Sequence, residues 1–345
     1  MRGYGPFYIL GPQQQFAILS LRRELKPHTH AMPARPPVST SLMLIGNTPV
    51  VRLRHVVPEN CAQIFLKIES VNPTGSYKDR MAKSMIEEAE RRGDLKPGMT
   101  VVEATGGSTG SSLAFLCAVK GYKFHVVSSN TFAIEKLRTM SAFGALLDLT
   151  HSPTGTITPT LIPSMIQRAE QVAKADNYYF TNQFINKDSL IGYETIGHEL
   201  VEQFPQGIDA FCGAVGTAGM VMGVARVLKS KWTGTHIAVV EPGSSPTITE
   251  NRPGPHSVEG IGIGYVPPHL DRHLYDEALA ISEEEGRSMC RRLAKEEGLL
   301  AGTSTGLNVV AAIKLAKQLG PGKRVVTVAA DTGLKYLNGG LFADK

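Results

Sequence analysis

Short apolar runs of strand length alternate with longer segments whose apolar residues recur at helical spacing. The strand-like runs cover residues 64–68, 100–104, 123–127, 208–212, 236–241 and 324–329. The helix-like segments cover residues 81–92, 111–119, 161–175, 189–203 and 282–297. Alternation of buried strands with helices is typical of parallel sheets that carry helices on both faces. The pattern therefore predicts an α/β protein.

Glycine-rich loops lie next to several of these helices. Residues 105–110 (Thr-Gly-Gly-Ser-Thr-Gly) and residues 213–219 (Gly-Ala-Val-Gly-Thr-Ala-Gly) each join a strand to a helix. Residues 302–306 open a further helix that extends to about residue 319. In open α/β sheets, ligands bind beyond the carboxyl ends of the strands, where glycine lets backbone amides approach an anion. We expect these loops to converge on one ligand.

A fourth loop, residues 72–80, places a lysine directly before a helix. It consists of Asn-Pro-Thr-Gly-Ser-Tyr-Lys-Asp-Arg and follows the apolar run 64–68. The helix dipole disfavours a cation at this position, which helps to keep the Lys78 amine neutral. A neutral amine can form a Schiff base. The loop alone also fits an ordinary surface lysine, so the choice depends on the other loops.

These four loops, in this order, resemble those of the fold-type II pyridoxal-phosphate enzymes, and specifically the cysteine synthase (O-acetylserine sulfhydrylase) and cystathionine β-synthase family. The resemblance runs from Ile45-Gly46-Asn47-Thr48-Pro49 to Tyr336-Leu337. It implies a tryptophan synthase β-like α/β fold with domains at residues 43–186 and 187–345, and residues of about 50–71 crossing into the second domain. It also implies that the cleft between the domains holds pyridoxal 5′-phosphate.

The resemblance assigns roles to the residues that match the family's loops. Lys78 would form the Schiff base and then act as the base at the substrate α-carbon. Ser304 would face the pyridine nitrogen, and a neutral hydroxyl there favours elimination from the β-carbon over transamination. Ser108 would contact the 3-hydroxyl of the cofactor. The phosphate would lie against Gly213, Gly216, Thr217, Ala218 and Gly219. The substrate carboxylate would be held by Thr105, Gly106, Ser108, Thr109 and Gln183.

The chain departs from the family at several of these positions. The common substrate loop is Thr-Ser-Gly-Asn-Thr-Gly, whereas this chain has Gly106 in place of the serine and Ser108 in place of the asparagine. Tyr77 replaces a small aliphatic residue, and Gly192 stands where histidine is common. These changes are compatible with cofactor binding, but they leave the amino-acid substrate open.

The implied activity is that of a transferase: sulfide replaces the leaving group of an O-activated L-serine, most simply O-acetyl-L-serine, to give L-cysteine. One alternative is a β-lyase that releases pyruvate and ammonia from cysteine or serine. Others are a synthase for another β-substituted alanine and a non-catalytic paralogue. A dinucleotide site is a further alternative for residues 213–219, with Glu241 as the ribose acid. The glycine spacing there is G-x-x-G-x-x-G rather than G-x-G-x-x-G, which favours the phosphate loop.

Composition excludes several other classes of protein. Of the 345 residues, 42% are hydrophobic and 19% are charged, which indicates an ordered globular chain long enough for two domains. The net charge of +5 is spread along the sequence, so we expect no nucleic-acid partner. No apolar stretch is long enough for a membrane helix. The four cysteines, Cys61, Cys117, Cys212 and Cys290, lie far apart, which predicts a reducing compartment without disulfides or a zinc site.

Residues 1–42 form a basic N-terminal extension ahead of the first family motif. We interpret it as a disordered tail of a cytoplasmic protein, and a mitochondrial presequence is the alternative. The resemblance implies that the enzyme is a homodimer.

Overall fold

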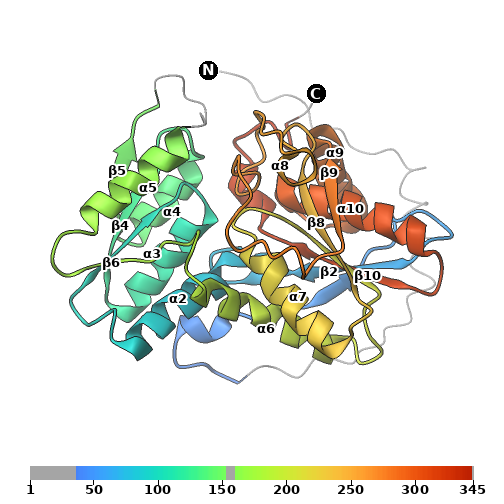
Figure 1. The fold of residues 1–345 in the computed structure, drawn as a ribbon, viewed down its shortest axis with the longest axis horizontal. Helices are drawn as coiled ribbons and strands as arrows, with labels where there is room; N and C mark the ends of the chain where they lie inside the picture. Colours follow the sequence, from blue (N-terminus) through green and yellow to red (C-terminus); the bar gives the residue numbers. More distant parts are fainter. Residues whose placement is uncertain (1–35, 153–159, 344–345) are drawn as a thin grey trace, which may run out of the picture. The chain divides into compact units, whose positions relative to one another are not determined.

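The computed structural model describes residues 36–152 and 160–343 (Figure 1). Residues 39–345 form one compact unit. The predicted N-terminal extension, residues 1–42, lies almost entirely outside the described residues. Among the described residues, no helix combines the length and the apolar character needed to cross a membrane.

The larger of two sheets has six strands in the order β1-β2-β10-β7-β8-β9. Its strands are β1 (Val50–Arg52), β2 (Gln63–Ile68), β7 (Ala210–Ala214), β8 (His236–Pro242), β9 (Glu277–Ile281) and β10 (Arg324–Ala329). Only β1 runs antiparallel to its neighbour within this sheet. Every residue of β7 is buried, as expected for a central parallel strand that is covered on both faces.

The smaller sheet is fully parallel and has the order β5-β4-β3-β6. Its strands are β3 (Thr100–Ala104), β4 (Lys123–Ser129), β5 (Leu146–Thr150) and β6 (Tyr178–Phe180). Helix α5 (Leu161–Val172) packs on one face through Leu161, Met165 and Ala169. Helices α3 (Ser108–Lys120) and α4 (Ile134–Ala142) pack on the other face.

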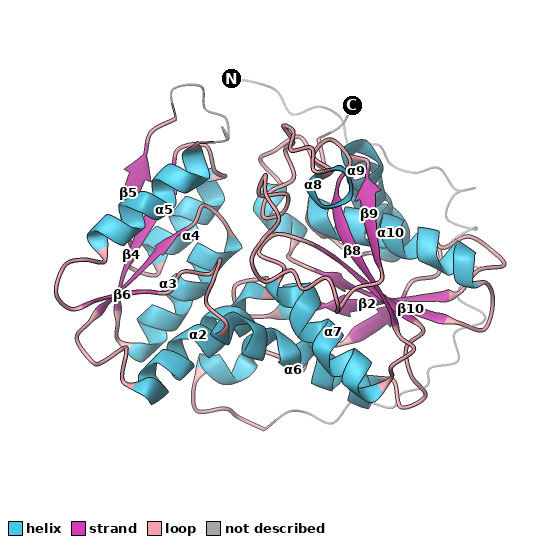
Figure 2. Cartoon of the chain, in the orientation of Figure 1, coloured by secondary structure: helices cyan, strands magenta, loops and turns pink. Residues whose placement is uncertain are grey.

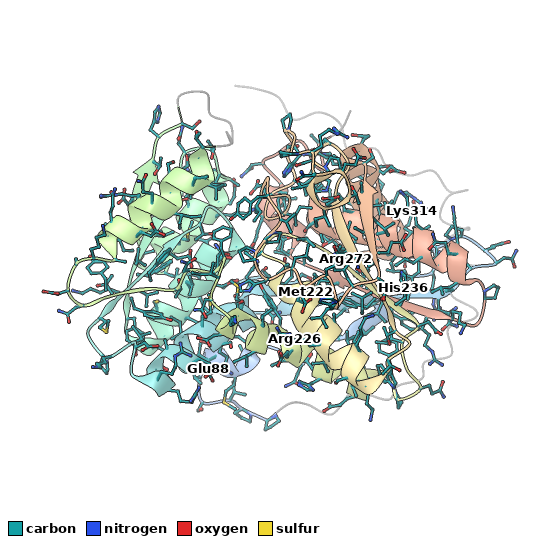
Figure 3. The ribbon with its side chains drawn as sticks, viewed as in Figure 1. Glu88, Met222, Arg226, His236, Arg272 and Lys314 are labelled. Carbon is teal, nitrogen blue, oxygen red and sulfur yellow. The ribbon has the colours of Figure 1, made fainter. Side chains whose placement is uncertain are left out.

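Helices α2 (Lys78–Arg92), α6 (Asp188–Gln203) and α7 (Gly219–Lys231) form a row along one side of both sheets (Figure 2). Helices α9 (Glu283–Arg292) and α10 (Thr303–Leu319) cover the opposite face of the larger sheet. On α7, Met222 is fully buried and Arg226, one turn later, is exposed (Figure 3). The short elements are η2 (Ser41–Leu44), η3 (Glu69–Val71), α8 (Thr247–Glu250), the π-helical turn η4 (Leu293–Glu297) and η5 (Gly333–Tyr336).

The predicted α/β class with parallel sheets and flanking helices is confirmed. Sequence analysis missed β1, β5, β6, β9 and α4. Strands β1 and β6 have only three residues each, and β5 and β9 are partly exposed edge strands, of which β5 is interrupted by Asp148. The segment 50–68 lies in the larger sheet, where β2 pairs with β10. The division into domains near residue 186 stays a prediction.

Candidate active site

One cavity of about 520 Å³ brings the predicted loops together. It lies at the carboxyl ends of strands from both sheets, as expected for ligand sites in parallel sheets. Most of the predicted site residues line it: Lys78, Thr105, Gly106, Ser108, Thr109, Gln183, Gly216, Thr217 and Ser304. Gly213, Ala218 and Gly219 do not line it; they belong to the strand and helix on either side of the phosphate loop.

Lys78 is the first residue of α2, and its side chain is buried in the cavity wall. Its amine lies 5.1 Å from the centre of the Tyr77 ring and 5.9 Å from that of Tyr193. Burial lowers the pKa of the Lys78 amine from 10.5 to about 8, while the charge of Glu103 opposes this shift. Two effects therefore favour the neutral form of the Lys78 amine: the helix dipole, and desolvation, which disfavours the ammonium form.

Hydrogen bonds fix the loop that carries Lys78 against the end of β10. The Tyr77 amide donates to the Ala330 carbonyl at 3.1 Å, and Ser76 forms a bridge with Asp331. Asp79 accepts hydrogen bonds from the amide and the hydroxyl of Thr74, at 2.8 and 2.5 Å. The role of Asp79 is thus to close the turn before the helix.

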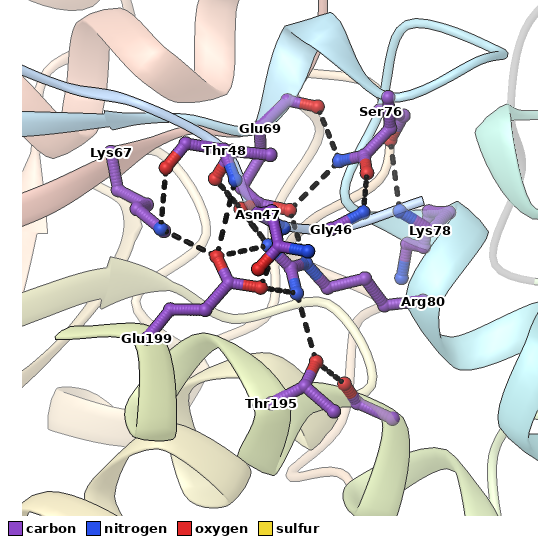
Figure 4. Close-up of polar contacts among 12 residues, drawn as sticks. Gly46, Asn47, Thr48, Lys67, Glu69, Ser76, Lys78, Arg80, Thr195 and Glu199 are labelled. Carbon is purple, nitrogen blue, oxygen red and sulfur yellow. Dashed lines mark hydrogen bonds and ion pairs between the residues drawn. The ribbon is translucent and has the colours of Figure 1, made fainter. Parts of the chain in front are cut away.

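Behind Lys78 lies a buried ionic network centred on Arg80 (Figure 4). The Arg80 guanidinium contacts Glu69 at 2.7 and 2.8 Å and Glu199 at 2.6 and 2.9 Å. Lys67 donates to Glu199 at 2.6 Å, and the Thr48 hydroxyl donates to Glu69 at 2.7 Å. The network ties the start of α2 to α6, to β2 and to the segment 45–49 that opens the family resemblance.

Two of the departures from the family follow from close contacts. A Cβ atom at position 106 would lie 1.9 Å from the Phe132 ring, so the ring occupies the space that a serine would need. A Cβ atom at position 192 would lie 2.4 Å from the Arg80 carbonyl oxygen, because α6 contacts the backbone of α2. A third departure, Tyr77, packs edge-to-face against Tyr193 with 5.5 Å between the ring centres.

The substrate loop is joined to the segment that follows β6. The Thr109 hydroxyl donates to the side-chain oxygen of Gln183 at 2.8 Å, and the side-chain nitrogen of Gln183 donates to the Ala104 carbonyl at 3.3 Å. Ser108 begins α3 and accepts a hydrogen bond from Lys335 at 3.2 Å. Hydroxyl and amide groups thus gather at the N-terminus of α3, where a carboxylate is favoured.

The phosphate loop leads into α7, and the described structure shows no side-chain cap at this helix start. A Cβ atom at position 216 would lie 2.2 Å from the Gly260 carbonyl oxygen, so only glycine lets residues 258–264 close over the loop. Free amides at a helix N-terminus and the Thr217 hydroxyl fit the phosphate of the expected cofactor. Ser304 lies in the first turn of α10 and lines the cavity. Gly302 is the N-cap of α10, so Ser304 does not cap this helix.

The cavity is also lined by residues outside the predicted site set, among them Lys136, Glu259, Asp331 and Tyr336. The Tyr336 hydroxyl donates to Asp331 at 2.6 Å. Lys136 pairs with Glu259 and lies 4.7 Å from the centre of the Tyr336 ring. A lone cation on a helix resembles a surface residue in the sequence, yet only 2% of the Lys136 side chain is exposed. For Tyr336 the sequence did contain a signal, because this residue lies at the end of the segment that resembles the family.

The comparisons agree with this geometry. A family model described as pyridoxal-phosphate dependent enzyme matches residues 42–331. A cysteine synthase of Staphylococcus aureus is 42% identical over 312 residues, which cover 90% of this chain and 99% of that protein. The crystal structure of a cysteine synthase from Entamoeba histolytica has a TM-score of 0.85 at 33% identity, over 91% of this chain and 94% of that one. A hydrogen sulfide-producing enzyme from Fusobacterium nucleatum has a TM-score of 0.82 at 35% identity, over 87% and 100% of the two chains.

Proposed function

This chain belongs to the pyridoxal-phosphate-dependent enzyme family, and on that premise we propose that it makes L-cysteine from O-acetyl-L-serine and sulfide. In this β-replacement, acetate leaves the β-carbon with the bonding electrons and sulfide takes its place. The observation that supports it best is one cavity that combines the buried Lys78 amine, the Gly216–Thr217 turn before the uncapped start of α7 and a hydroxyl–amide cluster at α3. The cysteine synthases among its relatives support the choice of product.

Lys78, the amides and hydroxyl at residues 216–217 and the hydroxyls of Ser304 and Ser108 would hold the cofactor. When bound, pyridoxal phosphate withdraws electrons and so makes the α-proton of an amino acid removable. The Lys78 amine would take up that proton, because burial brings its pKa close to neutral pH. Thr105, Thr109 and Gln183 would bind the substrate carboxylate and orient the α-carbon towards this amine.

The test is product analysis of the purified enzyme. With O-acetyl-L-serine and sulfide together, we expect cysteine to form in step with the loss of sulfide, and with O-acetyl-L-serine alone we expect little pyruvate. Pyruvate released at the same rate with and without sulfide would instead identify a β-lyase. The lyase is the second candidate because a hydrogen sulfide-producing enzyme is among the similar structures and because Ser108 replaces the family's asparagine.

A second prediction concerns the contact between Lys335 and Ser108. An ammonium group only donates hydrogen bonds, so the Ser108 oxygen accepts from Lys335 and its own proton is available to a ligand. Replacing Lys335 with methionine removes this orientation, and we expect cofactor affinity to fall about tenfold, in line with the loss of a charge-assisted hydrogen bond. Titration of the apoenzyme with pyridoxal phosphate measures the change.

The exposed Lys317 on α10 provides the matched control, and Lys317→Met should bind the cofactor as the wild type does. Because Lys335 acts through Ser108, the double variant with Ser108→Ala should bind no worse than Ser108→Ala alone. Additive losses would show that Lys335 acts independently of Ser108.

We further propose a homodimer that works in the cytoplasm on a small amino acid and sulfide. All four cysteines are free, which supports a reducing compartment. Size-exclusion chromatography with light scattering tests the oligomeric state, and a monomer at micromolar concentration would contradict it.

A further inference from the structure

Glu103 is a carboxylate buried in the smaller sheet, outside the residues that line the cavity. It is the fourth residue of β3, and none of its surface is exposed. Its neighbours in the strand, Val101, Val102 and Ala104, belong to the apolar core. A buried carboxylate costs free energy unless hydrogen bonds compensate it, so this position calls for a specific explanation.

Three donors surround the Glu103 carboxylate. Oε1 accepts from the backbone amide of Ala104 at 2.9 Å. Oε2 accepts from the Thr181 hydroxyl at 2.7 Å and from the backbone amide of Gln183 at 3.0 Å. All three contacts use Glu103 as the acceptor. The arrangement is therefore satisfied by the ionised carboxylate, which accepts but does not donate.

These contacts join the two segments that form the substrate-carboxylate site. Strands β3 and β6 are neighbours in the sheet, and the loop 105–109 and the segment 181–184 follow their carboxyl ends. Asn182, between two of the donor residues, has a left-handed backbone with φ of 46°, which is rare outside glycine. Bonds on both sides of Asn182 hold this conformation and thereby direct the Gln183 side chain towards Thr109 and Ala104.

We propose that Glu103 is a positioning residue for the substrate: its buried carboxylate fixes Gln183 against the end of β3 and so shapes the site for the α-carboxylate of an amino acid. The inference rests on the proposed function only in naming that ligand. Glu103 does not line the cavity, and it would act on the substrate through Gln183 and the loop after β3.

The same three hydrogen bonds favour the ionised form of the Glu103 carboxyl group. Burial raises the pKa of Glu103 to about 7, and the hydrogen bonds from Thr181, Gln183 and Ala104 and the charge of Lys78 oppose this shift. Glu103 is also the one charged group in the described part of the chain that raises the pKa of the Lys78 amine.

The test compares two probes on the holoenzyme: L-alanine, which has a carboxylate but no leaving group, and ethylamine, which lacks the carboxylate. Both are followed by the absorbance change of the bound cofactor. In Glu103→Gln, the NH2 group of the new side chain would face a backbone N–H donor in place of a carboxylate oxygen. We therefore expect the binding of alanine to weaken about tenfold, while the binding of ethylamine changes less than twofold. A purely structural role would weaken both probes equally, and that result, or no change in either, would overturn the proposal.

Thr181→Val provides a second test of the proposal if the Glu103 variant does not fold. It removes one donor and leaves the charge in place, so we expect a loss of about threefold for alanine and none for ethylamine. Equal losses for the two probes in Thr181→Val would also overturn the proposal. The comparison does not depend on the leaving group or on sulfide, so an enzyme that made no cysteine would refute the proposed function and leave this test valid.

Discussion

Replacing Lys78 with alanine should lower the rate of cysteine formation by roughly 10²–10⁴-fold, the range for loss of a positioned acid–base group. The variant should also lose the covalent attachment of the cofactor, because the buried amine at the start of α2 is absent. Borohydride reduction followed by peptide mapping measures that attachment directly. In the wild type, the label should appear on the peptide that contains Lys78.

Lys83 provides the control for this experiment. It lies in the same helix, is partly exposed and does not line the cavity, so Lys83→Ala should keep both the label and the activity. A label on a different lysine in the wild-type enzyme would refute the assignment of Lys78, although the fold and the family would stand.

The largest effect on stability is expected at Arg80. Replacing it with methionine leaves the carboxylates of Glu69 and Glu199 without their shared partner, and removing one partner of a buried ion pair typically costs about 3–5 kcal/mol. Urea unfolding should show this as a lower midpoint with an unchanged slope. Arg252 is the matched control: its pair with Glu250 is 60% and 54% exposed, so Arg252→Met should unfold close to the wild type.

The pH dependence of the Arg80 effect has a defined sign. Burial alone would raise the pKa of Glu199, but Arg80 and then Lys67 lower it from 4.5 to about 2. A carboxyl with a lowered pKa contributes stability above its unfolded pKa and loses it as the pH falls towards the folded value. The difference in unfolding free energy between the wild type and Arg80→Met should therefore shrink between about pH 4.5 and 2. A difference that stayed constant over this range would mean that Glu199 draws no stability from Arg80.

Local signals in the sequence were enough to find the loops of the site. Glycine between a strand and a helix, and a lysine at a helix start, have direct structural consequences, and these loops do line one cavity. Contacts between distant segments were not predictable in the same way. Gly106 is explained by the ring of Phe132, and Gly192 by the backbone of Arg80, and neither neighbour is visible in the local pattern.

Two of the residues that were missed share one physical property. Lys136 and Glu103 are charged groups whose burial is compensated by partners from other elements: Glu259 in one case, and Thr181 and Gln183 in the other. Such compensation exists only in the folded chain, so a sequence pattern treats the first as a surface residue and overlooks the second. The fold class, by contrast, depends on apolar periodicity, which the sequence displays directly.

The pairing of β2 with β10 has a consequence for biosynthesis. Residues 63–68 leave the ribosome well before their parallel partner, residues 324–329. Until those residues have been made, β2 lacks the neighbour that separates it from β7, and its apolar side chains Ile64, Leu66 and Ile68 have no completed sheet to join. Pairings of such long sequence separation form slowly and expose hydrophobic edges meanwhile. The nascent chain is therefore expected to depend on chaperones until residues 324–329 have emerged from the ribosome.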